Sequence, residues 1–235
     1  GLKLSGTVGS TLQLQNFQQT TSKENTMYNR DNKMIQKYTD QGPTQTAMAA
    51  MFAITSIKTK TFLLPDMLDS YRDEGPKTLK NVMNKQIEGI AYVMEKKEWL
   101  YNSVQSYKAG DIYPEELLLS LQSIPSIGLV KAGFIMQLTT GEAGCFDCHN
   151  LKEYSLNKNT FKVEGKDKGK ITAANFNKAR KYLAVCKEIG GSEVLWNNWC
   201  NLIAEKYPNH FESADDVSWL HSNSIMGIHQ TIARG

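Results

Sequence analysis

The sequence predicts an all-α fold, a single compact helical domain that follows a polar N-terminal extension. Apolar residues recur at spacings of three and four over most of the chain beyond residue 43, which is the period of an amphipathic helix. Breaks such as Gly75-Pro76 separate these runs at helix-like lengths. Hydrophobic residues make up 40% of the 235 residues, enough for a core of this size. We therefore place the extension at 1–43 and the helical domain at 44–235.

The predicted elements follow from local signals along the chain. The extension is rich in Gln, Asn, Thr and Ser, and alternating leucines near its start predict a strand or an extended arm. In the helical domain, Thr44 is expected to cap the first helix, and Ser192 to cap the last long one. Helices are predicted over 44–57, from Pro65 to Tyr71, over 79–101, from Pro114 to Ile124, over 129–138, 173–189 and 192–206, and from Asp215 to Trp219.

The region 115–138 is predicted to be a helical hairpin with a tight turn, Pro125-Ser126-Ile127-Gly128. A helix that starts directly after such a turn has backbone N–H groups without acceptors, and its dipole favours an anion there. Gly128 lets a phosphate approach without an interfering Cβ. The turn is therefore a candidate grip for a nucleic-acid backbone, without reading of bases.

A carboxylate, Asp147, follows the second hairpin helix and a short connector. Phe146 before it and Cys148 after it indicate partial burial. A carboxylate placed beside a sugar can stabilise oxocarbenium character or orient a water nucleophile. Asp147 is therefore the main candidate for acid–base or electrostatic chemistry.

These two segments carry a resemblance to a known family. Ile-Pro-Ser-Ile-Gly-Leu-Val-Lys-Ala at 124–132 resembles the helix–hairpin–helix of the DNA glycosylase superfamily (HhH-GPD) typified by endonuclease III. Gly-Cys-Phe-Asp-Cys-His-Asn-Leu at 144–151 resembles the segment where that family has Val-Asp-Thr-His. The resemblance implies a two-lobed helical fold, DNA between the lobes and a nucleotide flipped out of the duplex. It also implies catalytic positions for Asp147 and His149.

The sequence departs from the family pattern at three places. Ser126 replaces the first hairpin glycine. The Schiff-base lysine of bifunctional members falls on Val130, and Lys131, one residue later, is rotated by about 100° on a helix. We therefore expect either a monofunctional enzyme or one that performs other chemistry, with Lys131 kept as a further catalytic candidate. The family's C-terminal four-cysteine cluster is absent, so no iron–sulfur cluster, other cofactor or metal is predicted.

The DNA-binding candidates lie in the hairpin and in a lysine-rich loop at 157–170, although a solvated lysine loop without a ligand remains an alternative. These candidates are Ser126, Ile127, Gly128, Val130, Lys131, Lys158, Lys162, Lys166, Lys168 and Lys170. The net charge of +3 is too small to indicate nucleic-acid binding without these local features.

The leading interpretation is a DNA glycosylase-superfamily enzyme acting on a modified or damaged base. One alternative is an enzyme of the same fold that processes hypermodified thymidine in bacteriophage DNA. Another is a non-catalytic DNA-binding or virion-associated helical protein. DNA is the expected partner, and no apolar run reaches the roughly 18 residues of a membrane span. We expect a cytoplasmic location, in the host cytoplasm or the virion if the protein is viral.

The four cysteines allow other interpretations of the segment around Asp147. Free thiols in a reducing compartment are the simplest interpretation of four cysteines in a chain of this length. Cys145, Cys148 and His149 also form a literal Cys-x-x-Cys-His haem-attachment pattern. A zinc site completed by Cys186, Cys200 or His149, and a redox dithiol at 145 and 148, are further alternatives.

Overall fold

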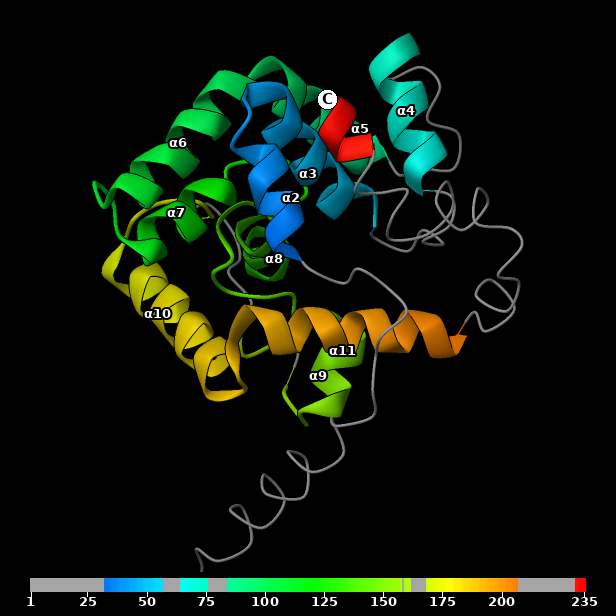
Figure 1. The fold of residues 1–235 in the computed structure, drawn as a ribbon. Helices are drawn as coiled ribbons and strands as arrows, with labels where there is room; N and C mark the ends of the chain where they lie inside the picture. Colours follow the sequence, from blue (N-terminus) through cyan, green and yellow to red (C-terminus); the bar gives the residue numbers. More distant parts are fainter. Residues whose placement is uncertain (1–31, 57–63, 76–83, 158, 162–167, 207–230) are drawn as a thin grey trace, which may run out of the picture.

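The computed structural model describes residues 32–56, 64–75, 84–157, 159–161, 168–206 and 231–235. Within these ranges the protein is helical and contains no strand, which confirms the all-α prediction for this part of the chain (Figure 1). The helices are α2 (Asn32–Thr39), α3 (Pro43–Thr55), α4 (Leu64–Glu74), α5 (Asn84–Glu95), α6 (Lys97–Ala109), α7 (Pro114–Leu121), α8 (Leu129–Thr140), α9 (Cys148–Glu153), α10 (Ala173–Glu188) and α11 (Gly191–Lys206), with a last helical turn at 231–234.

Two apolar helices, α3 and α8, form the centre of the described structure. Every residue from Thr46 to Thr55 of α3 is buried, as is nearly all of α8. A helix that is apolar on all sides needs neighbours on all sides. Accordingly, α3 packs against α2, α4, α5, α6 and α8, and α8 also packs against α2, α6 and α7. The rings of Phe52 and Phe134 meet edge to face at 5.5 Å and join the two central helices.

The C-terminal helices enclose one end of α8. In Figure 1, α10 leads into α11, which runs below α8, and α9 lies beneath α11. α10 packs against α7 and α11, while α11 also packs against α9. Trp196 and Trp199 of α11 approach the ring of Phe134 to 6.4 and 6.2 Å. This packing places the residues after α8 between α8, α9 and α10.

Several predicted boundaries differ from those observed. α3 begins at Pro43 with Gly42 at its N-cap, so Thr44 is not the cap, because proline already supplies the helical φ at the first position. Likewise, α11 begins at Gly191 and includes Ser192. The first hairpin helix ends at Leu121 rather than at 124.

Other differences concern whole elements. In its described part, the helix predicted over 79–101 consists of α5 and α6, which meet at Lys96. The short helix α9 was not predicted. The strand or arm near the start of the chain and the helix from Asp215 to Trp219 lie outside the described residues.

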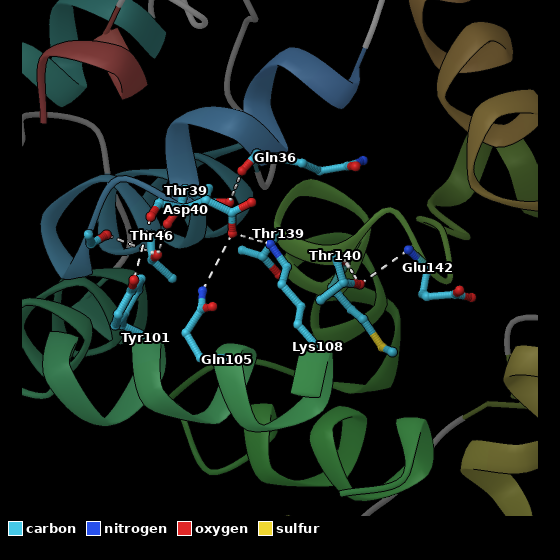
Figure 2. A network of polar contacts seen from close by, with 12 residues as sticks. Gln36, Thr39, Asp40, Thr46, Tyr101, Gln105, Lys108, Thr139, Thr140 and Glu142 are labelled. Atoms are coloured by element: carbon cyan, nitrogen blue, oxygen red, sulfur yellow. Dashed lines mark hydrogen bonds and ion pairs between the residues drawn. The ribbon is translucent and has the colours of Figure 1, made fainter. Parts of the chain in front are cut away.

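Residues 32–39, which the sequence analysis placed in the N-terminal extension, form helix α2 on the surface of α3 and α8. Figure 2 shows polar contacts that join the end of α2 to α3 and α6. The Asp40 carboxylate after α2 accepts hydrogen bonds from Lys108 and, at 3.4 Å, from Gln105, both on α6. The Thr46 hydroxyl of α3 donates to the Thr39 carbonyl at 2.8 Å. α2 is thus tied to both α3 and α6.

Across the ranges that the structure describes, no helix combines the length and the apolar character that crossing a bilayer requires.

Candidate nucleic-acid interface

The predicted hairpin is present, with a seven-residue connection, 122–128, between α7 and α8. Pro114 occupies the first position of α7, and the Tyr113 amide donates to the Glu116 carboxylate at 2.8 Å, which fixes the start of the hairpin. In the connection, Ser126 has a φ of +66°, in the left-handed region that favours glycine. The backbone at 126 therefore has a conformation suited to the glycine that the resembling hairpins carry there.

The start of α8 has the features expected of an anion grip. Gly128 is exposed, its backbone is extended (φ −95°), and a Cβ placed on it would meet no heavy atom within 4 Å. No side chain caps this end of the helix. The first amides of α8 point out of the helix without an intrahelical acceptor, and the positive end of the helix dipole lies at the same place. An anion can therefore reach these amides from the exposed side of Gly128.

The residues next to Gly128 differ in whether they can contact an anion at the start of α8. The Ile127 side chain is fully buried, and its amide donates to the Ile124 carbonyl at 3.2 Å, so neither faces a ligand. Val130 is half-buried and packs against the core. Of the predicted hairpin contacts, the structure thus favours Gly128 and the following amides.

Two glycines let other segments touch the hairpin connection. A Cβ on Gly89 of α5 would lie 2.7 Å from the Pro125 carbonyl oxygen and 3.2 Å from the Ser126 hydroxyl. A Cβ on Gly169 would lie 3.2 Å from the Ser123 amide nitrogen. The connection is therefore held between α5 and the end of the lysine-rich loop.

The lysine-rich loop is described only in part. Lys158, Lys162 and Lys166 lie outside the described residues. Lys168 is half-buried and Lys170 is exposed, and Gly169 between them touches the hairpin connection. The structure thus places the backbone between Lys168 and Lys170 against the hairpin connection.

Asp147 is the N-cap of α9. One of its carboxylate oxygens accepts hydrogen bonds from the His149 amide at 3.0 Å and from the Asn150 amide at 2.9 Å. The buried Asn150 side chain donates in turn to the Cys145 carbonyl at 2.7 Å. The His149 side chain is exposed. Backbone amides thus fix the orientation of the Asp147 carboxylate through one oxygen, and the second oxygen takes no part in these two hydrogen bonds.

The connector between α8 and Asp147 is held by Tyr182 of α10. The Tyr182 hydroxyl donates to the Gly144 carbonyl and accepts a hydrogen bond from the Phe146 amide at 3.4 Å. Ala143 in the same connector has a φ of +60°. Burial raises the pKa of Tyr182 well above its ordinary value, so the hydroxyl stays protonated and remains a donor. This contact fixes the backbone directly before Asp147.

Lys131 lies in the first turn of α8 and points back to the end of α3. Its Nζ donates to the Ser56 hydroxyl at 2.9 Å and lies 5.1 Å from the centre of the Phe134 ring. The charges of Lys131 and Asp147 both act on the Cys145 thiol: the lysine lowers its pKa and the aspartate raises it. Two of the three catalytic candidates, Lys131 and Asp147, therefore influence the same buried thiol.

Cys145, Cys148 and Cys186 are free thiols in the described part of the chain. Burial raises the pKa of Cys145 to about 11, while Cys148 is exposed. Phe146 and Asp147, the two residues between them, form no turn. No group of three or more His, Cys, Asp or Glu side chains close enough to hold a metal ion occurs among the described residues.

Sequence reasoning missed the residues that support the site. Ser56, Tyr182 and Gly89 carry no motif, because their roles depend on contacts between distant segments. The Asn150 side chain acts over a shorter range, on the Cys145 carbonyl five positions earlier, and also carries no motif.

Comparison of the chain with known protein families, with curated proteins and with solved structures found no significant match. Its function is therefore inferred from its residues and their geometry.

Proposed function

We propose that this protein is a DNA-binding enzyme of the two-lobed helix–hairpin–helix glycosylase type, acting on a modified or damaged base. The observation that carries the proposal is the hairpin itself: an exposed Gly128 directly before the uncapped start of α8. Backbone amides and the helix dipole at such a position bind a phosphate without selecting a base sequence. Lys168 and Lys170, which lie beside the connection, add positive charge for the same backbone.

The chemistry is assigned to the Asp147 carboxylate. Its position on the connector after α8 is fixed by the Tyr182 contacts and by the amides of α9. A preorganised carboxylate of this kind can stabilise positive charge that develops on a sugar during cleavage of a glycosidic bond. Lys131, which donates a hydrogen bond to Ser56, provides a positive charge. In this proposal Lys131 acts through that charge and does not form a Schiff base.

The first experiment tests the hairpin with two substitutions of Gly128. Aspartate at an N-cap satisfies the free amides and favours the helix, but its negative charge repels a phosphate. We expect Gly128→Asp to be at least as stable as the wild type and to lose salt-sensitive binding to a fluorescent DNA duplex. Gly128→Asn caps the helix without charge and is expected to retain part of the binding. Equal binding by all three proteins would refute the hairpin grip.

The second experiment separates chemistry from capping at Asp147. Asparagine is as good an N-cap as aspartate, so Asp147→Asn keeps the α9 cap and removes only the charge. We expect this variant to bind DNA normally but to lose base release in a screen of duplexes carrying modified bases. Full activity of Asp147→Asn would exclude the catalytic role.

A non-catalytic DNA-binding protein is the second candidate function. The observation that favours it is the use of the Asp147 carboxylate as a helix cap, which gives this residue a structural role without any chemistry. It predicts DNA binding through the hairpin in wild type and Asp147→Asn alike, and no base release from any duplex by either protein.

A further inference from the structure

Two lysines from segments far apart in the sequence meet beside the hairpin connection. Lys85 lies in the first turn of α5, four residues before Gly89, and residues four apart share a face of a helix. Gly89 is the residue through which α5 touches Pro125 and Ser126. The face of α5 that carries Lys85 is therefore the face that contacts the hairpin.

Lys168 reaches the same region from the other side. Gly169, its neighbour, touches the hairpin connection at Ser123. The pKa of Lys168 is lowered, first by burial and then by the positive charge of Lys85. This agrees with the backbone contacts of Gly89 and Gly169, which bring the two segments to the same connection. The two lysines thus form a like-charge pair.

Nothing in the described structure neutralises this pair. Neither the Lys85 nor the Lys168 side chain forms an ion pair or a hydrogen bond with any described residue, and Glu88, one turn along α5, forms no ion pair with Lys85. The first turn of α5 contains no acidic residue, so its dipole adds to the positive potential. A pair that repels itself in the free protein gains stability when an anion binds between its members.

The hairpin connection also contains polar groups without partners. Gln122 is 1% exposed, and neither its amide nitrogen nor its amide oxygen has a hydrogen-bond partner among the described residues. Within the same ranges, the buried hydroxyl oxygen of Ser126 is likewise without one. Buried polar groups in native proteins are normally paired, so these exceptions call for an explanation.

We propose that Lys85 and Lys168 together bind one phosphate of the DNA strand whose backbone the hairpin grips. The inference rests on the proposed function and adds a second phosphate site, supplied by α5 and the loop before α10. Two lysines from different segments would position the strand across the connection, in addition to the amides at the start of α8. DNA would then contact three segments around the hairpin.

The test measures binding of a fluorescent 20-bp duplex (a length on the order of two helical turns) over a salt series. Each lost phosphate contact reduces the slope of log K against log salt by about 0.9. We expect Lys85→Ala and Lys168→Ala each to reduce the slope by about this amount and less than additively together, because they share one phosphate. Lys85→Arg and Lys168→Arg should retain the wild-type slope, because they keep the charge.

Lys187→Ala is the matched control. Lys187 is an exposed lysine without an ion pair at the far end of α10, about 22 Å along the helix from its start. It should not change the slope. A wild-type slope in both alanine variants, with binding still abolished by Gly128→Asp, would overturn the Lys85–Lys168 site and leave the hairpin function standing.

A second measurement tests the pair without relying on the salt series. The pKa of the Lys168 ammonium, followed by NMR of labelled lysine side chains, should rise in Lys85→Ala and should rise on addition of duplex to the wild type. No rise in Lys85→Ala would show that the two charges do not meet, and the site would be rejected. Absence of any duplex binding by the wild type at low salt would reject the proposed function and this site with it.

Discussion

Ser126 shows how one residue can carry strain in the connection between two helices. A left-handed conformation costs an L-residue other than glycine on the order of 1 kcal/mol, and the buried Ser126 hydroxyl has no partner. Both costs fall on the connection that holds the start of α8. Strain kept at such a position is often associated with function.

The first prediction follows from that strain. We expect Ser126→Gly to raise the free energy of unfolding by about 1 kcal/mol, because glycine adopts this φ without cost and removes the unpaired hydroxyl. Urea unfolding of the two proteins measures the difference. Ser120→Gly is a matched control in the helix α7, where glycine is expected to destabilise by up to about 1 kcal/mol. A Ser126→Gly variant less stable than the wild type would show that the hydroxyl has a partner in solution.

The individual site residues also show the limits of sequence reasoning. Asp147 and Gly128 were found because a carboxylate after a hairpin and a glycine before a helix are local patterns. The cap made by Asp147 was not foreseen, since it depends on α9, a six-residue helix too short for apolar periodicity to predict. Lys85 and Tyr182 act through contacts between distant segments, which one sequence does not reveal.

At the scale of elements, close packing between helices sets the position of the hairpin. α5 approaches the connection at Gly89, where the helix surface meets a backbone carbonyl rather than a flexible side chain. Protein interiors are packed closely enough that one added methyl group is felt by its neighbours. The hairpin is therefore supported from α5 as well as from its own two helices.

The second prediction concerns this contact. Alanine in place of glycine favours a helix by up to about 1 kcal/mol, but its Cβ on Gly89 would lie 2.7 Å from the Pro125 oxygen. We expect the clash to dominate, with Gly89→Ala destabilising by about 1–3 kcal/mol and weakening duplex binding. Thermal unfolding and the binding assay measure both effects. Ala91→Ser, an exposed change on the same helix, should alter neither by much; a stabilised Gly89→Ala with normal binding would contradict the contact.

The elements were predicted with differing success for physical reasons. α3, α8 and α10 were expected near their observed positions because Pro43, Gly128 and the Gly190-Gly191 break mark their ends. α7 ends before Ile124 although Ile124 is apolar and buried, because burial continues into the connection after helical hydrogen bonding stops. The division between α5 and α6 at Lys96 has no glycine or proline to signal it.

On the scale of the whole molecule, burial of ionisable groups couples stability to pH. Burial raises the pKa of Cys145 from 9.0 to about 11 and that of Tyr154 from 10.0 to about 12. In both cases the folded state favours the neutral form, while the unfolded chain ionises at the ordinary value. The stabilisation is therefore complete below about pH 9 and is lost as pH rises towards the folded-state values.

The third prediction is a loss of stability at alkaline pH. A shift of two pKa units at the fully buried Cys145 corresponds to at most about 2.7 kcal/mol, lost between about pH 9 and pH 11. Urea unfolding at pH 8, 9, 10 and 10.5 measures the decline. Cys145→Ala should show a shallower decline over this interval, whatever its stability at pH 8. The same slope in both proteins would exclude the thiol as the cause.

The aromatic cluster under Lys131 has an optical consequence. Trp196 and Trp199 lie 5.3 Å apart between ring centres, and both contact Phe134, over which the Lys131 ammonium is placed. Indole emission depends on the electric field at the ring. Movement or neutralisation of the Lys131 ammonium therefore shifts the wavelength of maximum tryptophan emission. Lys131 lies in the first turn of α8, at the end of the helix where the proposed function places a phosphate. Under that proposal, binding of a duplex would shift the tryptophan emission, which can be followed without any added label.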